Sequence, residues 1–201
     1  KLTIQDFDDI DQFLEKFTET KKQYLTRKCS FEGTLQWVKD TNAKLPNLCS
    51  PSMTSICEDI YLFGGKKENG LPTNELWYFH NNKWILLQTK NTPRPRYDCS
   101  LNSFPNHLIL YGGQDGINVF SDLIVLDIKT LTWEEIKNNI NKPEGRFAHA
   151  SCVSEDQIWI FGGKNNTKYF NDFFCYDFSI NKWSKIITQK APEPRAWHSA
   201  F

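Results

Sequence analysis

The sequence of 201 residues has no excess of charge of either sign, because 24 Lys and Arg balance 24 Asp and Glu. It also has no apolar run close to the roughly 18 residues that span a bilayer. Nucleic-acid binders and polybasic membrane binders normally carry a surplus of basic residues. We therefore expect neither nucleic-acid binding nor membrane insertion. The acidic opening shows no signal peptide, and we expect a cytoplasmic protein.

Recognisable catalytic and metal-binding motifs are missing as well. The six cysteines form no CxxC pair, and no Cys/His cluster has zinc spacing. Cys99, Cys152 and Cys175 lie in or beside apolar runs, so we interpret them as buried free thiols in a reducing compartment. There is no HExxH, GxSxG, GxGxxG or GxxxxGK[ST] motif. We therefore expect no catalytic residues, no bound metal and no cofactor.

An apolar run that ends in two glycines is present three times, as IYLFGG (60–65), LILYGG (108–113) and IWIFGG (158–163). The glycine pairs are separated by 48 and 50 residues. Glycine has no Cβ and takes positive φ, so such a pair lets the backbone turn abruptly or lie against another element. We interpret the pairs as structural positions, namely Gly64, Gly65, Gly112, Gly113, Gly162 and Gly163.

Two further landmarks recur at the same period. Each glycine pair is followed by an acidic residue after Asn or Ser, an aromatic run, a polar turn and a tryptophan. These tryptophans are Trp84, Trp133 and Trp183, and Trp37 precedes them by 47 residues. Next come TPRPRYDC (92–99), KPEGRFAH (142–149) and APEPRAWH (191–198), which contain Arg96, Arg146 and Arg195. The first junction, LPNLCSPS (45–52), has no arginine.

A period near 50 with short strands matches the kelch class of propeller repeats. Over roughly residues 35–201 the glycine pair, the acidic opening, the aromatic run, the Trp and the Pro-x-x-Arg-x-x-His junction resemble kelch repeats. The resemblance implies an all-β kelch β-propeller whose blades each have four antiparallel strands, A to D. We expect a partial propeller over 29–201, with blades at about 50–90, 97–139 and 147–188 and the start of another at 196–201.

The predicted ring is incomplete, because propellers typically close with 4–8 blades. We therefore expect the chain to be part of a longer protein, with the rest of the propeller outside residues 1–201. Residues 29–40, which contain Trp37, would be an isolated outer strand. Our hypothesis is that this strand completes the last blade and ties the ends of the ring together.

Residues 1–28 have the pattern of an amphipathic helix. Phe7, Ile10, Leu14 and Phe17 repeat at steps of three and four residues and form one apolar stripe. Acidic residues come first and basic residues last, which suits the helix dipole. The helix could pack on the propeller rim or on a preceding domain, or it could dock a partner or a second copy.

Histidines offer one possible metal site, since some kelch propellers carry copper oxidase sites. His149 and His198 nevertheless hold the same repeat position, which Cys99 holds after Arg96. His80 likewise stands where other repeats have an acidic turn residue. We interpret these histidines as structural.

The resemblance also implies where a partner would bind. Kelch proteins use the loops at one end of the propeller, which are here the B–C loops 66–73, 114–120 and 164–170 and the D–A junctions. In some kelch proteins a junction arginine grips a carboxylate of the ligand. Alternatively, these arginines bond to acids or carbonyls of a neighbouring blade. The predicted partner-binding residues are Arg96, Arg146, Arg195, Lys66, Asn69, Gln114, Asp115, Asn118, Lys164 and Asn165.

The sequence thus favours a protein-interaction module or scaffold that recruits a protein partner through its propeller loops. A ubiquitin-ligase adaptor and a cytoskeletal or trafficking scaffold are examples. One alternative is a propeller enzyme acting on a small molecule or sugar. Another is a purely structural subunit of a larger assembly, with contacts through the rim and the N-terminal helix.

Overall fold

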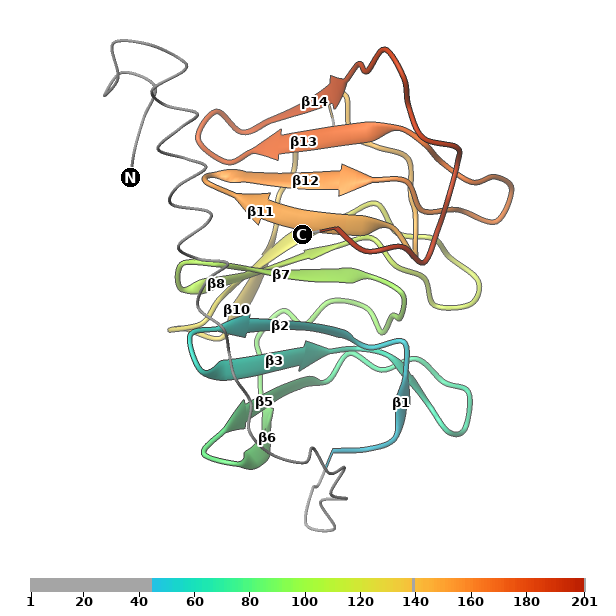
Figure 1. Ribbon diagram of the computed structural model, residues 1–201. Helices are drawn as coiled ribbons and strands as arrows, with labels where there is room; N and C mark the ends of the chain where they lie inside the picture. Colours follow the sequence, from blue (N-terminus) through green and yellow to red (C-terminus); the bar gives the residue numbers. More distant parts are fainter. Residues whose placement is uncertain (1–44, 139, 201) are drawn as a thin grey trace, which may run out of the picture. The chain divides into compact units, whose positions relative to one another are not determined.

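The computed structural model describes residues 45–138 and 140–200 (Figure 1). All regular structure in these two ranges is β-strand. The helix predicted for residues 1–28 and the outer strand predicted for 29–40 lie outside the described residues. In the described part no helix is long and apolar enough to cross a membrane.

Three antiparallel sheets of four strands follow one another along the chain (Figure 1). Each sheet is a simple meander, so strands adjacent in sequence are adjacent in space. The first holds β2 (Ser52–Ile56), β3 (Asp59–Phe63), β5 (Leu76–His80) and β6 (Lys83–Leu87); the second β7 (Ser100–Phe104), β8 (His107–Tyr111), β9 (Leu123–Asp127) and β10 (Thr132–Glu135); the third β11 (Ala150–Ser154), β12 (Gln157–Phe161), β13 (Phe173–Asp177) and β14 (Lys182–Ile186).

These sheets confirm the predicted all-β class with about three four-stranded blades. A small two-stranded sheet joins β1 (Leu48–Cys49) to β4 (Lys66–Lys67). Residues 187–200 carry no strand of their own, so the further blade predicted at 196–201 stays a prediction. The predicted blade limits likewise stay predictions.

The glycine pairs end the second strand of each blade. Gly112 and Gly113 follow β8 with φ of 63° and 95°. A Cβ on Gly112 would lie 2.5 Å from the carbonyl oxygen of Arg146, and one on Gly113 would lie 2.7 Å from the Cβ of Cys99. Real Cβ atoms do not approach so closely, so these positions need glycine for both backbone conformation and space.

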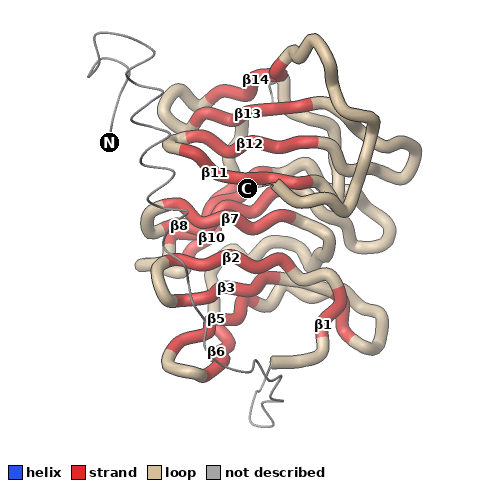
Figure 2. Tube along the Cα trace, viewed as in Figure 1, coloured by secondary structure: helices blue, strands red, loops and turns tan. Residues whose placement is uncertain are grey.

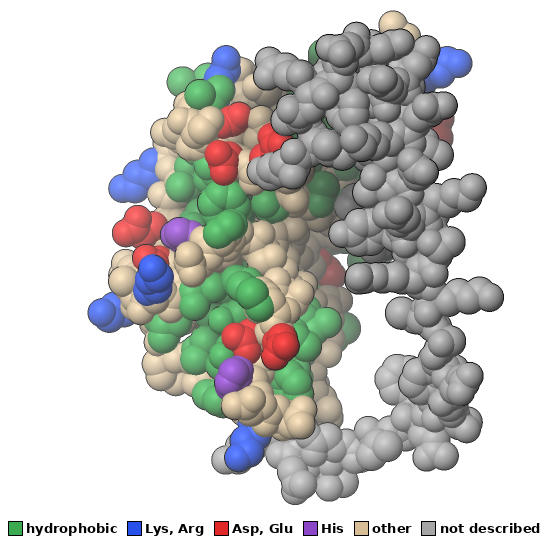
Figure 3. Space-filling model, turned by 60° about the vertical axis from the view of Figure 1, so that its left-hand side comes forward, with side chains coloured by type: hydrophobic (Ala, Val, Ile, Leu, Met, Phe, Trp, Pro, Cys, Tyr) green, Lys and Arg blue, Asp and Glu red, His purple; other side chains and the backbone are tan. Residues whose placement is uncertain are grey.

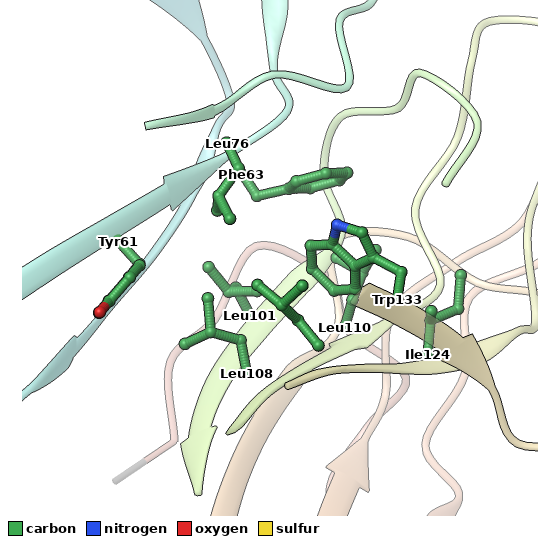
Figure 4. Packing of buried hydrophobic residues seen from close by; sticks show 9 residues of the cluster. Tyr61, Phe63, Leu76, Leu101, Leu108, Leu110, Ile124 and Trp133 are labelled. Atoms are coloured by element: carbon green, nitrogen blue, oxygen red, sulfur yellow. The ribbon is translucent and has the colours of Figure 1, made fainter. Parts of the chain in front are cut away.

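The hydrophobic core lies between neighbouring blades. Trp133 on β10 contacts Phe63 on β3 of the preceding blade, with ring centroids 5.3 Å apart (Figure 4). Trp183 on β14 contacts Tyr111 on β8 in the same way, at 5.6 Å. Both tryptophans are buried. The recurring Trp therefore joins the second and third blades each to the blade before it.

The first strands of successive blades are joined by backbone hydrogen bonds, two residues before each of these strands begins. Asp98 N donates to the carbonyl of Ser50 (3.2 Å), Ala148 N to that of Asp98 (2.9 Å), and Trp197 N to that of Ala148 (2.8 Å). All four residues have positive φ, between 52° and 56°. These hydrogen bonds place β2, β7 and β11 beside one another in chain order (Figure 1).

Candidate functional site

The B–C loops and the D–A junctions lie at the same end of the blades, because a meander of four strands alternates its connections between two ends (Figure 2). Isolated bridges pair Tyr97 with Gln114 and Phe147 with Lys164 there. We call this the loop end. The opposite end carries the A–B and C–D turns, and we call it the turn end. Figure 3 brings the turn end forward and shows hydrophobic side chains among acidic side chains and histidines.

Arg96 is fully buried at the loop end, with 0% of its surface exposed. Its Nη1 and Nη2 donate to the two carboxylate oxygens of Asp122 at 2.6 and 2.8 Å, and Nη1 also donates to the carbonyl of Gly112 at 2.9 Å. Its guanidinium stacks on Phe120, 4.1 Å from the ring centre. The side chain therefore belongs to the second blade.

The backbone of Arg96 belongs to the first blade. Its N–H donates to the carbonyl of Thr73, and its carbonyl accepts from Gly65 N. Arg146 repeats the arrangement one blade later, with its guanidinium on Asp172 and the carbonyl of Gly162. It too is fully buried. Each arginine therefore bridges two blades, which supports the alternative that these residues hold the junctions.

Arg195 occupies the same position after the third blade. Its N–H donates to the carbonyl of Phe170, and its carbonyl accepts from Gly163 N. Arg96 and Arg146 make the same two backbone hydrogen bonds to the B–C loops of the blades before them. Its side chain differs, because it is exposed and Nε donates only to the carbonyl of Glu193. Arg96 and Arg146 are buried by the blade that follows each of them, whereas the described residues include no blade after Arg195.

The predicted loop residues are all brought to the loop end, and all are at least partly exposed. Several hold their own loops in shape: Asn69 accepts from Leu71 N, Asp115 from Ile117 N and Asn118 N, and Asn165 from Thr167 N and Lys168 N. Gln114 donates to Asp98. Lys66 and Lys164 instead contact aromatic rings. Direct partner contact by these residues stays a prediction.

The KLHDC2/KLHL20/DRC7 Kelch-repeats domain model matches residues 30–201. The chain belongs to this kelch-repeat family. The resemblance predicted from the glycine pairs, tryptophans and junctions is therefore confirmed.

Individual kelch relatives are diverse. Tip elongation aberrant protein 1 of Schizosaccharomyces pombe is 29% identical over 157 residues, which cover 72% of this chain and 14% of that protein. Acyl-CoA-binding domain-containing protein 5 of Arabidopsis thaliana is 31% identical over 163 residues, covering 78% and 25%. N-(sulfonatooxy)prop-2-enimidothioate sulfolyase of Thlaspi arvense is 29% identical over 125 residues, covering 58% and 36%. The chain spans at most a quarter of the first two relatives.

The kelch loop end also exposes large apolar side chains that the sequence analysis did not single out. Leu71 and Ile117 lie at the tips of the first and second B–C loops, with 62% and 84% of their surface exposed. Tyr169 and Trp197 are also exposed there. Their positions carry no periodic signal, because loop residues follow neither the strand period nor the repeat consensus. Only their apolar character within polar loops could have marked them.

The charges of the B–C loops are unevenly satisfied. The five carboxylates in these loops and in the short segments that lead from them into the next strand all have partners: Glu68 with Asn47, Glu75 with Lys67, Asp115 within its own turn, Asp122 with Arg96, and Asp172 with Arg146. Among the loop lysines, Lys66 and Lys164 have no carboxylate partner within the described residues, while Lys67 pairs with Glu75 and Lys168 with Glu144. The loop end therefore offers unpaired positive charge while its loop acids are occupied.

His149 is a buried residue of the second D–A junction, three residues after Arg146. Its Nε2 lies 2.9 Å from the Ser100 hydroxyl, its ring meets the edge of Tyr111, and its Nδ1 is buried without a partner. Burial, and then the nearby Arg146 charge, lowers the pKa of His149 from 6.5 to about 3. His149 is therefore neutral in the folded protein, as the structural interpretation of this position implies.

Stability is expected to fall as the pH is lowered from 7 to 5. In this window the unfolded chain protonates His149 and the folded chain does not, because the folded pKa is depressed. His149 alone should reduce the free energy of unfolding by about 2 kcal/mol at pH 5. Denaturant titrations at several pH values would measure this. His149→Cys, which takes the residue held at the same position by Cys99, should flatten the dependence; an equally steep loss in that variant would contradict the assignment.

A groove of about 810 Å³ lies beside the ion pair of Arg96 and Asp122. It runs between the first D–A junction and β10, and its lining includes Arg94, Asp122, Trp133 and Glu135. A smaller groove of about 600 Å³ holds the equivalent place at the next junction, with Asp172 and Trp183 in its lining. Because the groove recurs with the repeat, we interpret it as a consequence of blade packing. Among the described residues no three His, Cys, Asp or Glu side chains gather as a metal site requires.

Proposed function

We propose that this chain recruits a protein partner through its loop end. Kelch repeat domains commonly act as protein-interaction scaffolds, and membership of the family gives the coarse function. The loop end adds the finer one. There, exposed apolar tips at Leu71 and Ile117 share the loop end with Lys66 and Lys164, which form no ion pair within the described residues. Apolar anchors with a polar rim are typical of protein interfaces.

One observation carries the proposal. Arg96 and Arg146 are buried, and their guanidinium groups pair with Asp122 and Asp172 inside the fold. These ion pairs hold the junctions in place, while the B–C loops beside them remain exposed. Rigid scaffolds that present variable loops are a common design for recognition. We therefore leave Arg96 and Arg146 out of the proposed contact surface and assign it to the loop tips and to Lys66 and Lys164; a contact by Arg195 stays a prediction. A cytoplasmic location stays a prediction.

Affinity capture from source extract with the full-length protein tests this assignment. In the variant Leu71→Ser with Ile117→Ser, we expect the recovered partner to fall at least tenfold, because two exposed anchors at one interface are lost. The matched control is Ile180→Ser, which removes an exposed isoleucine from the C–D turn at the turn end. Equal recovery by the loop variant, or a loss with Ile180→Ser alone, would move the interface away from the loop end.

A further inference from the structure

The outer edge of β10, the last strand of the second blade, is only partly covered. Lys90 on the first D–A junction forms a parallel bridge to Thr132. Lys90 N donates to the carbonyl of Leu131 at 2.8 Å, and the carbonyl of Lys90 accepts from Trp133 N at 3.1 Å. The pairing ends there, where Asn91 has a left-handed φ of 53° and the junction turns away. The junction therefore begins a fifth strand on this blade without completing it.

Beyond this bridge, backbone groups of β10 have no partner among the described residues. Successive residues of a strand direct their N–H and C=O groups to one side and then to the other. Ile136 N donates to the carbonyl of Leu123 on the β9 side, so Trp133 and Glu135 direct their groups outward. The hydrogen bond from Trp133 N to Lys90 agrees with this. The carbonyl of Trp133 and both backbone groups of Glu135 are therefore available to an added strand.

The groove of about 810 Å³ lies along this edge. It runs between the junction at 91–94 and β10, and its lining includes Glu134 and Glu135. Buried apolar side chains of Ile124 and Trp133 also line it (Figure 4). The groove lies between the first and second blades, which are both described, so it does not belong to an end of the blade array.

Two acidic side chains stand beside the uncovered edge. Glu134 and Glu135 are both exposed, and neither forms an ion pair within the described residues. The equivalent groove at the next junction has Ser184 and Lys185 at these positions. Blade packing therefore produces the groove at both junctions, but it does not require the two carboxylates. They make the groove of the second blade suitable for a basic ligand.

The cations of the groove limit how basic that ligand can be. Three of them line it, namely Arg94, Lys137 and Lys142. The pKa of Asp115 is lowered, first by hydrogen bonds from Asn118 and also by the nearby charge of Arg94, so Arg94 lies close to a carboxylate of its own. Lys137 follows Glu135 by two residues, on the same side of the chain. A long basic run would meet Lys137 with like charge, whereas two basic residues beside the glutamates would not.

Resting on the proposed function, we infer that the outer edge of β10 binds an extended segment of the partner that carries two consecutive Lys or Arg residues. The segment continues the parallel pairing that Lys90 begins, so that one of its residues donates to the carbonyl of Trp133 and accepts from Glu135 N. Its consecutive side chains point to opposite faces, and the two basic residues therefore reach Glu134 and Glu135. Main-chain pairing supplies affinity, and the charge-assisted contacts supply specificity.

Selection of binders from a random peptide library, with the full-length protein as bait, tests the inference. We expect the selected peptides to share two adjacent Lys or Arg residues. The variant Glu134→Ser with Glu135→Lys should weaken their binding at least about tenfold and remove the basic preference, because attraction is replaced by repulsion. It takes the residues that the fold already holds at Ser184 and Lys185, and thermal melting checks that it stays folded.

The matched control is Glu58→Ser with Glu155→Lys. It changes the net charge by the same amount, at two exposed positions in A–B turns of the turn end. We expect the selected peptides to bind this control as they bind the parent protein. An equal loss of binding in the control would show that only the net charge of the protein matters, and would overturn the site.

Methylation of single backbone nitrogens in a selected peptide tests the strand pairing itself. Methyl groups on the N–H groups that face β10 should weaken binding at least about tenfold, and those on the residues between them should change it little. An effect without this alternation would overturn the pairing. Peptides without the basic pair, unchanged binding to the Glu134→Ser, Glu135→Lys variant, or no selection above background would overturn the inference as a whole.

The two proposals fail separately. If the selected peptides lose binding with Leu71→Ser and Ile117→Ser but not with the β10 variant, the loop end is the interface but the edge of β10 is not the site. If they bind all of these variants equally and lose binding with Ile180→Ser, both proposals are wrong.

Discussion

Replacing Arg146 with alanine is expected to lower the free energy of unfolding by about 3–5 kcal/mol, which is the usual cost of removing one partner of a buried ion pair. The substitution leaves Asp172 and the carbonyl of Gly162 without their donor and removes the ring contact with Phe170. It also removes one of the links between the second and third blades. Denaturant unfolding of the purified protein would measure the change.

The control for this prediction is Arg94→Ala. Arg94 lies on the first D–A junction, two residues before Arg96, but its side chain is exposed and forms no ion pair within hydrogen-bond distance. We expect a change within about 0.5 kcal/mol there. Arg146→Lys should recover only part of the loss, because an ammonium does not reproduce the planar fork. Equal stability of Arg146→Ala and Arg94→Ala would show that the bridge does not hold the blades together.

Replacing Trp133 with alanine is expected to cost about 3–5 kcal/mol, the usual range for truncating a buried aromatic residue. Trp133 fills the space between two blades, where its ring meets Phe63, and its Nε1 donates to the Thr89 hydroxyl at 3.2 Å. Alanine would leave a cavity at that interface. The same unfolding experiment would report the loss, and hydrogen exchange should show faster opening of β3 and β10.

The variant Trp133→Phe tests whether an aromatic ring alone is enough at this position, or whether the full volume and the hydrogen bond of Trp are needed. It keeps an aromatic ring against Phe63 but loses part of the volume and the Thr89 hydrogen bond, so we expect an intermediate loss. Ile140→Ala, at an exposed position, should change stability by no more than about 0.5 kcal/mol. If Trp133→Ala were as mild as Ile140→Ala, the recurring tryptophan would not be the joint between blades.

The blade architecture was predictable because its landmarks are local and repeat. Each glycine pair ends a buried strand, and each Trp follows at a fixed interval, so a period near 50 residues is visible without any knowledge of contacts. What the sequence could not show is the direction of the tryptophan contacts. Trp133 packs on the preceding blade, and that direction depends on how the blades twist and stack.

The sequence allows two roles for the junction arginines, a contact with a ligand carboxylate or a contact with a neighbouring blade. It also holds a signal that favours the second role. Arg96 meets Asp122 and Arg146 meets Asp172, in both cases 26 residues later. The junction without arginine has Leu48 there, and the blade after it has Glu75, which pairs with Lys67 instead. The arginine and the aspartate therefore change together within one chain.

The exposed apolar side chains of the loop end were not predictable. Ile117 and Trp197 belong to segments without strand periodicity, so nothing in their neighbours fixes whether they point into the core or into solvent. The strained backbone of Trp197 is likewise set by hydrogen bonds to a junction 49 residues earlier. Such features depend on long-range contacts, which repeat spacing alone does not reveal.

Site-specific photo-crosslinking in cells tests the central claim most directly. A photoreactive amino acid would replace Ile117 or Leu71 at the loop end, or Ile180 at the turn end, in the full-length protein. Our account predicts a crosslinked protein partner from Ile117 and Leu71 and none from Ile180. A partner crosslinked from Ile180 and not from the two loop positions would contradict it, and would place recruitment at the opposite end of the blades.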